Sequence, residues 1–191
     1  MNLILASQSP RRRELLALFD IPFTVRAADI DETMDLTLPP EAEVARVSRC
    51  KAEATPRGAD DVVVAADTIV VCDGTILGKP KTAEKAAAML RMLSGRAHTV
   101  MTGLTVLHGG RVYCRTEQTQ IHFRTLSARE IAHYVATGEP MDKAGAYGIQ
   151  GGAALFCERI EGDYYNVMGL PVCRLYEALL AVAPEILEGR A

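Results

Sequence analysis

The stretch Val62-Val63-Val64-Ala65-Ala66 is the clearest strand in this chain. Its β-branched residues face both sides, which is typical of a central strand buried on both faces of a sheet. The apolar pattern resumes at residues 69–72, and the Asp-Gly pair at 73–74 is a hairpin-turn signal. We therefore build the fold outward from a central strand that begins at residue 62.

The segments before this strand alternate between strand and helix patterns. Residues 3–6 form a short apolar run that predicts a buried strand. Ser9 suits the N-cap of the next helix and Pro10 its first position, and that helix is expected to continue through Phe19. The acidic residues and prolines of 27–40 indicate a loop, whereas residues 41–54 have helical periodicity.

The segments after the strand mix hairpins with helices. The predicted elements are a helix at 82–93, strands at 98–107 and 111–123, a helix after the capping box Ser127/Glu130, a strand at 153–160 and a helix at 171–183. A glycine-rich loop at 144–152 precedes the strand at 153–160. This mixture predicts an α/β or α+β domain with a mixed sheet.

Bulk composition narrows the classes of function. The chain has 191 residues, of which 49% are hydrophobic and 24% charged, as in an ordinary soluble globular protein. A net charge of −3 and a pI near 5.8 lack the basic bias of proteins that bind a nucleic-acid polymer. No leader pattern and no run of about 20 apolar residues is present, so we expect a cytoplasmic protein without a membrane span.

The cysteines and histidines show no metal-site spacing. The five cysteines are scattered and form no CxxC pair, and the four histidines are isolated from one another. Such spacing is unlike a disulfide framework or a zinc site. We expect reduced thiols and histidines with structural roles.

A candidate binding loop connects the predicted strand at 3–6 to the helix that follows it. Its sequence is Ser7-Gln8-Ser9-Pro10-Arg11-Arg12. The helix N-terminus, the hydroxyls and the arginine forks together form a plausible anion cradle. The GxxxxGK[ST] spacing of a Walker A loop is absent. The alternative interpretation is a capped surface helix with solvated arginines.

One aspartate and one acidic stretch are candidates for metal binding or acid–base catalysis. Asp67 follows five apolar residues and is predicted to lie at or near the end of a buried strand. It could hold a divalent cation or accept a proton from water, or it could simply cap the backbone. The acidic stretch 29–35, which includes Glu32, offers oxygen ligands suited to magnesium or manganese, although such loops are usually only solvated.

Two lysines and a glycine-rich block complete the candidates. Lys79 lies in a loop and Lys51 on a predicted helix, and either could neutralise phosphate or be an ordinary surface lysine. Glycines within residues 142–151 would let the backbone approach a ligand. Tyr147 could stack or pack, and Gln150 could read a base edge; alternatively, the block is a connection whose tyrosine fills a gap.

Taken together, these segments resemble the Maf family, the septum-formation-inhibitor-like nucleoside triphosphate pyrophosphatases. The resemblance covers nearly the whole chain, and we expect one Maf-like domain over residues 1–191. The matching blocks lie at residues 6–12, 66–68, 78–80, 93–95, 138–140, 142–151 and 169–171. Each block is short, but seven of them in the right order are specific.

The resemblance implies a fold and an activity. It implies an α/β fold with a long curved mixed sheet and flanking helices in two lobes around a cleft, similar to inosine triphosphate pyrophosphatases. It also implies cleavage of a nucleoside triphosphate between its α- and β-phosphates with a divalent cation (Mg, Mn or Co). The block at 142–151 is similar to the branch that acts on dTTP and UTP. A homodimer is expected on the same basis.

The resemblance also implies roles for individual residues. Asp67 matches the general base, and Glu32 and Asp67 match the metal-facing positions. The positions that hold the triphosphate are matched by Ser9, Arg11, Arg12, Lys51 and Lys79. The positions linked to base specificity are matched by Arg11, Thr68 and Gln150. Gln8 stands where the family often has a small residue, which puts no catalytic position in doubt.

Other functions remain open from the sequence. The same chemistry could serve 7-methyl-GTP or ITP, or a modified pyrimidine triphosphate. The chain could instead regulate septum formation through a protein partner, as the family name suggests. No separate docking segment is evident in the sequence, so we rank that regulatory role below catalysis.

Overall fold

The computed structural model describes residues 1–35 and 37–188 of the chain. Its strands are β1 (Leu3–Leu5), β2 (Phe23–Val25), β3 (Val62–Cys72), β4 (Thr75–Leu77), β5 (Ala97–His108), β6 (Arg111–Phe123) and β7 (Cys157–Glu161). Its α-helices are α1 (Pro10–Ala17), α2 (Pro40–Ala54), α3 (Ala83–Leu93), α4 (Ala128–Ala136), α5 (Tyr164–Met168), α6 (Val172–Val182) and α7 (Glu185–Glu188). Short 3₁₀ helices are η1 (Glu139–Asp142), η2 (Ala144–Ala146) and η3 (Gly152–Leu155).

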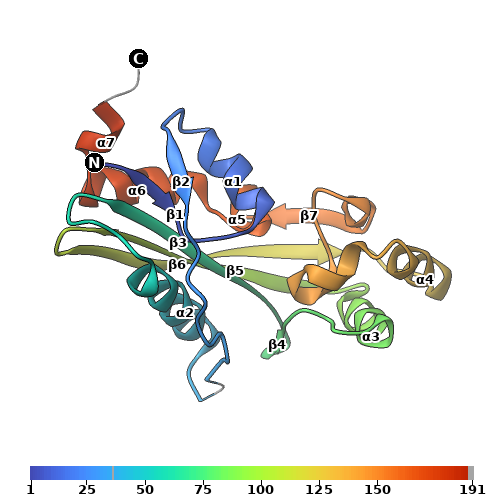
Figure 1. The fold of residues 1–191 in the computed structure, drawn as a ribbon. Helices are drawn as coiled ribbons and strands as arrows, with labels where there is room; N and C mark the ends of the chain where they lie inside the picture. The colour runs from blue at the N-terminus through green and yellow to red at the C-terminus, as the bar shows by residue number, and fades with distance from the viewer. Residues whose placement is uncertain (36, 189–191) are drawn as a thin grey trace. The chain divides into compact units, whose positions relative to one another are not determined.

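The strands form a mixed sheet. Over the described residues it has seven strands in the order β2-β1-β3-β5-β6-β7, with β4 paired to β3. β1 lies between β2 and β3 and runs parallel to both (Figure 1). Parallel neighbours need crossover connections, and α1 and α2 lie within those connections. The pairs β3–β4 and β6–β7 are antiparallel, so the prediction of an α/β fold with a mixed sheet is confirmed.

The chain divides into two compact units. The first unit comprises the described parts of residues 1–67, 102–117 and 169 onwards, and the second comprises residues 68–101 and 118–168. Strands β3, β5 and β6 contribute residues to both units. The expectation of a single domain over residues 1–191 stays a prediction.

The first unit is built on β1 and the first part of β3. Leu3–Leu5 and residues 62–64 are at most 1% exposed, which is the burial pattern predicted for central strands. Ser9 caps α1 by accepting a hydrogen bond from the backbone nitrogen of Arg12, and Pro10 occupies the first helical position. The predicted start of α1 is therefore confirmed, although the helix ends at Ala17 rather than at Phe19.

Helix α2 packs closely on β5 within the first unit. A Cβ atom added to Gly103 would lie only 2.3 Å from the backbone oxygen of Val44. Glycine at this position lets the two backbones approach one another. Because α2 also carries Lys51, this contact helps to fix the position of a predicted site residue.

The core of the second unit joins α3 and α4 to buried aromatic rings. Leu90 and Leu93 of α3 are fully buried in a cluster that also contains Phe123, Tyr134 and Phe156. Both hydrogen bonds of the predicted capping box are present at the start of α4. That prediction is confirmed.

The predicted strand at 153–160 is wrong in its first half. Gly152–Leu155 form η3, and the strand begins only at Cys157. The backbone nitrogens of Ala154 and Phe156 donate to carbonyls three residues earlier, so they are already used by local turns and do not pair with another strand. Strand β2 and helices α5 and α7 were not predicted.

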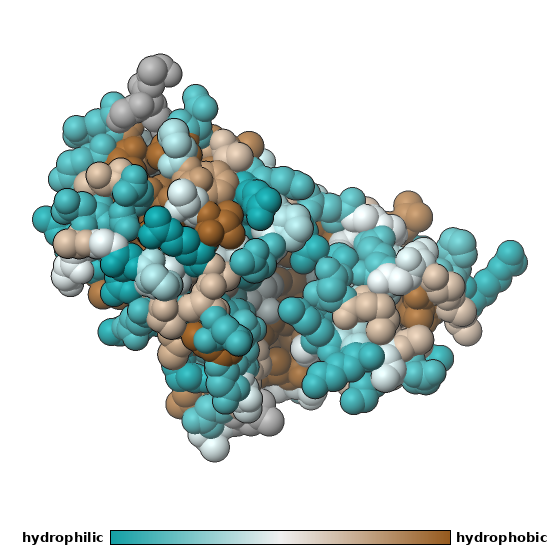
Figure 2. Space-filling view, viewed as in Figure 1, coloured by the Kyte–Doolittle hydropathy of each residue, from teal (hydrophilic) through white to brown (hydrophobic). Residues whose placement is uncertain are grey.

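The face drawn in Figure 2 is mostly hydrophilic, with apolar residues in small groups. Large apolar side chains that are exposed include Leu18, Val112, Leu155 and Leu180. Among the residues that the structure describes, none of the helices combines the length and the apolar character needed to cross a membrane.

Candidate active site

The turn between β1 and α1 is organised around the hydroxyl group of Ser7. Its oxygen accepts hydrogen bonds from the backbone nitrogen of Ser9 at 3.2 Å and from Nη1 of Arg12 at 3.3 Å. Nε of Arg12 donates to the carbonyl oxygen of Gly169 at 2.7 Å. The guanidinium group is therefore held from two sides, which favours the anion-cradle interpretation over that of a solvated arginine.

The surroundings of Arg12 combine desolvation with opposite charge. Burial lowers the pKa of Arg12, while the carboxylates of Asp67 and Glu32 oppose that shift. The group stays charged because arginine is effectively always protonated in proteins. Gly169, which accepts the Nε hydrogen bond, has φ +109°, a conformation that favours glycine.

Asp67 and Glu32 both contact the ammonium group of Lys51. Nζ of Lys51 lies 2.7 Å from Oδ1 of Asp67 and 3.0 Å from Oε1 of Glu32. The side chains of Asp67 and Lys51 are only 12% and 13% exposed, whereas that of Glu32 is 55% exposed. The structure thus brings three predicted site residues together, with the pair Lys51–Asp67 largely removed from water.

The expectation that Asp67 lies at or near the end of a strand is wrong. Asp67 lies in the middle of β3, which runs unbroken to Cys72. The last three residues of β3 pair with β4 in a hairpin, and this pairing extends the strand beyond the carboxylate. Asp67 therefore sits on a rigid strand rather than on a loop.

An ion pair that the sequence did not reveal anchors the acidic stretch to α2. The buried carboxylate of Glu43 accepts hydrogen bonds from Nε and Nη2 of Arg46 at 2.7 and 2.6 Å, and from the backbone nitrogen of Asp35 at 2.9 Å. Arg46 also donates to the carbonyl oxygen of Thr33 at 3.3 Å. The hydrogen bonds from Arg46 lower the pKa of Glu43. The loop that carries Glu32 is consequently tied to α2.

In the second unit, the loop of Lys79 contacts the glycine-rich block. The backbone nitrogen of Gly145 donates to the carbonyl oxygen of Gly78 at 3.2 Å. Gly145 has φ +67°, and a Cβ atom there would lie 2.8 Å from the side chain of Val70. Lys79 itself is exposed. The hydrogen bond therefore joins the loop of Lys79 to the glycine-rich block. The lack of a side chain at Gly145 lets the same block lie close to Val70.

Tyr147 packs in the core of the second unit. Its ring meets those of Phe123 and His98 edge-on, with centroids 4.8 and 5.4 Å apart, and its hydroxyl lies 2.8 Å from Nε2 of His98. Of the two interpretations of this tyrosine, packing is the correct one. Gln150, three residues later, is exposed and remains available to a ligand.

The burial of His98 predicts an acid-sensitive fold. Burial lowers the pKa of His98 from 6.5 to about 4. Between these pH values the unfolded chain binds a proton that the folded chain does not, so the free energy of unfolding falls as the pH decreases through this window. Over this whole pH window, the free energy of unfolding falls by about 3 kcal/mol because of His98. Urea unfolding of wild type and His98→Gln between pH 7 and pH 4 should show a flatter pH dependence for the variant.

His133 provides the control for this experiment because it is exposed on α4. His133→Gln should keep the pH dependence of the wild type. Carboxylates such as Glu130, whose pKa is lowered to about 2, contribute equally to all three proteins. If His98→Gln and wild type lost stability in parallel, the assignment to His98 would be wrong.

Arg11 and Thr68 are both half-buried. Arg11 lies in the first turn of α1, and Thr68 follows Asp67 in β3. The roles that the resemblance implies for them in base selection stay predictions.

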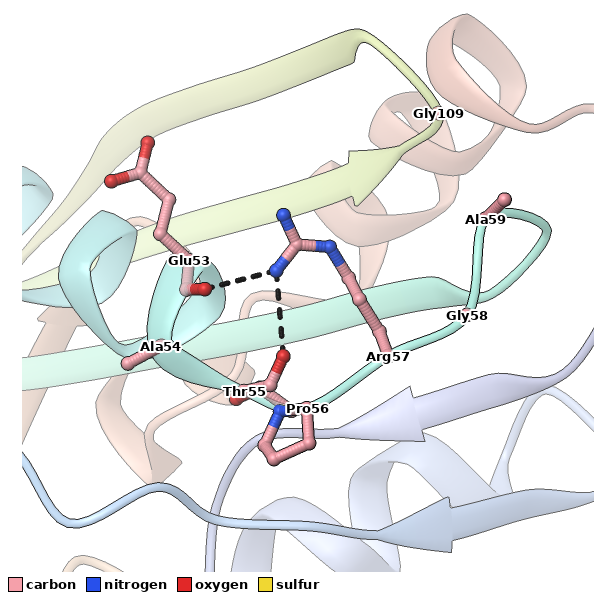
Figure 3. Close-up of a pocket in the computed structure, with 8 residues that line it drawn as sticks. All are labelled: Glu53, Ala54, Thr55, Pro56, Arg57, Gly58, Ala59 and Gly109. Carbon is pink, nitrogen blue, oxygen red and sulfur yellow. Dashed lines mark hydrogen bonds between the residues drawn. The ribbon is translucent and has the colours of Figure 1, made fainter.

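A surface pocket of the first unit lies at the C-terminal end of α2. Residues 53–59 and Gly109 line it (Figure 3). Nη1 of Arg57 donates to the carbonyl oxygens of Glu53 and Thr55 at 3.0 and 3.4 Å, so this guanidinium caps the helix end. The described lining of this pocket includes none of the predicted site residues.

Comparison with known proteins identifies the family. The profile of the Maf-like protein family matches residues 2–182. The chain is 52% identical over 187 residues to a dTTP/UTP pyrophosphatase of Moorella thermoacetica, covering 95% of this chain and 94% of that protein. It is 53% identical over 174 residues to a dTTP/UTP pyrophosphatase of a Geobacillus species, covering 91% and 94%.

One solved structure has a fold similar to that of this chain. A HAM1 protein from Coxiella burnetii matches with a TM-score of 0.51 at 15% identity, covering 95% of this chain and all of that one (100%). At that identity the similarity concerns the fold alone. With the family profile matched over almost its entire length, the chain belongs to the Maf-like protein family.

Proposed function

We propose that this chain hydrolyses dTTP and UTP, or modified pyrimidine triphosphates, to a monophosphate and pyrophosphate. The observation that carries the proposal is the convergence of Asp67 and Glu32 on Lys51. This cluster supplies both a carboxylate base and a cation for phosphate. The relatives that are about half identical to the chain and carry the name dTTP/UTP pyrophosphatase support the choice of substrate.

The triphosphate is held by polar and cationic side chains in this proposal. These are Ser9, Arg11, Arg12, Lys51 and Lys79. Arg12 is fixed in advance by Ser7 and Gly169, so its charge can meet that of a phosphate without reorganisation. Such preorganised charge stabilises a transition state more effectively than a mobile side chain does.

Asp67 acts as the general base in the proposed reaction. It accepts a proton from a water molecule whose oxygen attacks one phosphorus of the α–β anhydride. The new P–O bond forms as the anhydride P–O bond breaks, and pyrophosphate leaves with part of its charge neutralised by the cationic groups. The short contact with Lys51 holds the carboxylate in one orientation.

A divalent cation (Mg, Mn or Co) is part of the proposal. Glu32 and Asp67 provide carboxylate oxygens, which are the ligands that magnesium and manganese prefer. Both carboxylates already lie within 3.0 Å of one cationic nitrogen, so these two side chains fit such an ion. When bound, the ion would screen phosphate charge. In residues 1–35 and 37–188, no group of three or more His, Cys, Asp or Glu side chains forms a metal site.

A triphosphate panel tests the proposal. Wild-type protein is incubated with dTTP, UTP, dATP, GTP, ITP and 7-methyl-GTP in the presence of magnesium, manganese or cobalt, and pyrophosphate release is measured. We expect dTTP and UTP to be the best substrates and chelation of the metal to abolish turnover. Because Gln150, with Arg11 and Thr68, is proposed to select the base, Gln150→Glu should alter this order. A preference for 7-methyl-GTP or ITP would contradict the proposed substrate.

We also propose a cytoplasmic homodimer. The family resemblance supports the dimer, and the reduced thiols expected from the cysteine spacing support a cytoplasmic location. Equilibrium sedimentation and cell fractionation test the two statements. A monomer mass in sedimentation would refute the first of them.

A further inference from the structure

We propose, on the basis of the role proposed above for Gln150, that Glu139 and Tyr134 are positioning residues for base specificity. They hold the turn of residues 148–152, here called the Gln150 turn, at both of its ends. Neither residue is required to touch the substrate. Their effect is to fix where the amide group of Gln150 stands.

The contacts form a continuous chain of hydrogen bonds. Oε2 of Glu139 accepts from the backbone nitrogen of Gly152 at 3.0 Å, and Oε1 accepts from the hydroxyl group of Tyr134 at 2.8 Å. The hydroxyl oxygen of Tyr134 in turn accepts from the backbone nitrogen of Gly148 at 3.1 Å. Glu139 therefore binds one end of the Gln150 turn directly and the other through Tyr134.

The glycines of the Gln150 turn make this close approach possible. A Cβ atom on Gly151 would lie 2.1 Å from Oε1 of Glu139, and one on Gly152 would lie 3.2 Å from Cδ2 and Cε2 of Tyr134. The carboxylate thus occupies space that side chains would otherwise fill. The turn is closed by a bond from the nitrogen of Gly151 to the oxygen of Gly148, with Ile149 buried and Gln150 exposed.

The two positioning residues are themselves fixed. The ring of Tyr134 is buried and meets Phe156 edge-on at 5.1 Å. The backbone of Glu139 donates to Oγ1 of Thr137 at 3.2 Å and accepts from Nζ of Lys143 at 2.7 Å. Burial raises the pKa of Tyr134, so its hydroxyl stays a neutral donor at physiological pH. The turn is consequently attached to rigid groups rather than to mobile ones.

This arrangement predicts a selective effect on catalysis. A side-chain amide discriminates between bases through directional hydrogen bonds, which weaken when the donor and acceptor are displaced. Asp67 and Arg12, which are proposed to act on the phosphates, make none of these contacts. Loosening the turn should therefore raise KM for pyrimidine substrates and change kcat little.

The test uses Glu139→Gln and Tyr134→Phe with dTTP and dATP as substrates. In Glu139→Gln, an NH₂ group faces one of the two groups that donate hydrogen bonds to the carboxylate of Glu139. Tyr134→Phe removes the hydroxyl group that connects Gly148 to Glu139. We expect kcat/KM for dTTP to fall about tenfold, mostly through KM, with the preference for dTTP over dATP reduced. Gln150→Ala should relax the preference similarly, and adding Glu139→Gln to it should have little further effect, because the two act through one contact.

Two matched controls separate positioning from loss of stability. Glu130→Gln removes the ion pair between Glu130 and Arg124 at the start of α4, and Tyr165→Phe removes the hydroxyl group of an exposed tyrosine of the second unit. Both should keep the wild-type ratio of dTTP to dATP turnover. Folding of every variant is checked by circular dichroism, and Tyr134→Phe decides the matter if Glu139→Gln does not fold.

The outcomes distinguish this inference from the proposed function. If Gln150→Ala relaxes base preference while folded Tyr134→Phe and Glu139→Gln keep it, the positioning role is overturned and the proposed function stands. If Gln150→Ala itself leaves base preference unchanged, the proposed role of Gln150 fails, and the positioning role fails with it. Additive effects of Glu139→Gln and Gln150→Ala would also overturn the inference.

Discussion

Asparagine in place of Asp67 is expected to lower kcat for dTTP hydrolysis by about a thousandfold. The amide group has nearly the shape of the carboxylate but cannot accept a proton from water at neutral pH. The position on β3 and the neighbouring Lys51 would be retained, so the loss would reflect chemistry rather than geometry. Steady-state pyrophosphate release with saturating dTTP and metal measures it.

The same substitution should leave the fold intact. Loss of one partner usually destabilises a buried ion pair strongly, but Lys51 keeps its 3.0 Å contact with Glu32. We therefore expect the free energy of unfolding to fall by only about 1 kcal/mol. Urea unfolding of Asp67→Asn beside the wild type measures this difference.

Asp61 is a matched control because it is a second buried carboxylate of the same unit. Its oxygens accept hydrogen bonds from Nδ2 of Asn2 and from the backbone nitrogen of Gly58, both at 2.8 Å. Asp61→Asn should lower stability while keeping kcat. If Asp67→Asn retained wild-type turnover, the assignment of the general base would be refuted.

Local rules of helix and strand formation predicted most of the fold. The apolar run that begins at Val62 is a fully buried strand, and the capping box of Ser127 and Glu130 starts α4 as expected. Both depend on residues that are neighbours in the sequence. The sequence therefore contains enough information to place them without knowledge of the rest of the molecule.

Long-range contacts account for what the sequence did not predict. Arg12 was predicted by resemblance to hold phosphate, but the carbonyl oxygen that orients it belongs to Gly169, 157 residues later. No local sequence pattern predicts which carbonyl oxygen Arg12 will contact, because any backbone oxygen can accept its hydrogen bond. Glu43 was missed for the same reason, since an acidic residue in the first turn of a helix is ordinary.

The erroneous strand positions also have tertiary causes. Pairing with β4 extended β3 past Asp67, and local 3₁₀ bonds delayed the start of β7 to Cys157. The prediction that Lys51 and Asp67 are site residues came from the family resemblance. Their short contact, which joins a helix to a strand, came only from the structure.

Alanine in place of Gly103 is expected to lower the free energy of unfolding by about 3 kcal/mol. The added Cβ would meet the carbonyl oxygen and carbon of Val44 at 2.3 and 2.6 Å and the nitrogen of Ala45 at 2.9 Å. All three are backbone atoms of α2, so no side-chain rotation can relieve the clash. The helix must move away from β5, and chemical denaturation measures the cost.

Gly110 provides the matched control because no atom lies within 4 Å of a Cβ built there. Gly110→Ala should change stability by less than about 0.5 kcal/mol. Displacement of α2 in Gly103→Ala also moves Lys51 relative to Asp67 on β3, so the surviving folded protein should have a lower kcat for dTTP than wild type. Wild-type stability in Gly103→Ala would mean that α2 is not held against β5 by this contact. Reduced stability with wild-type kcat would instead mean that the Lys51–Asp67 pair tolerates movement of its helix.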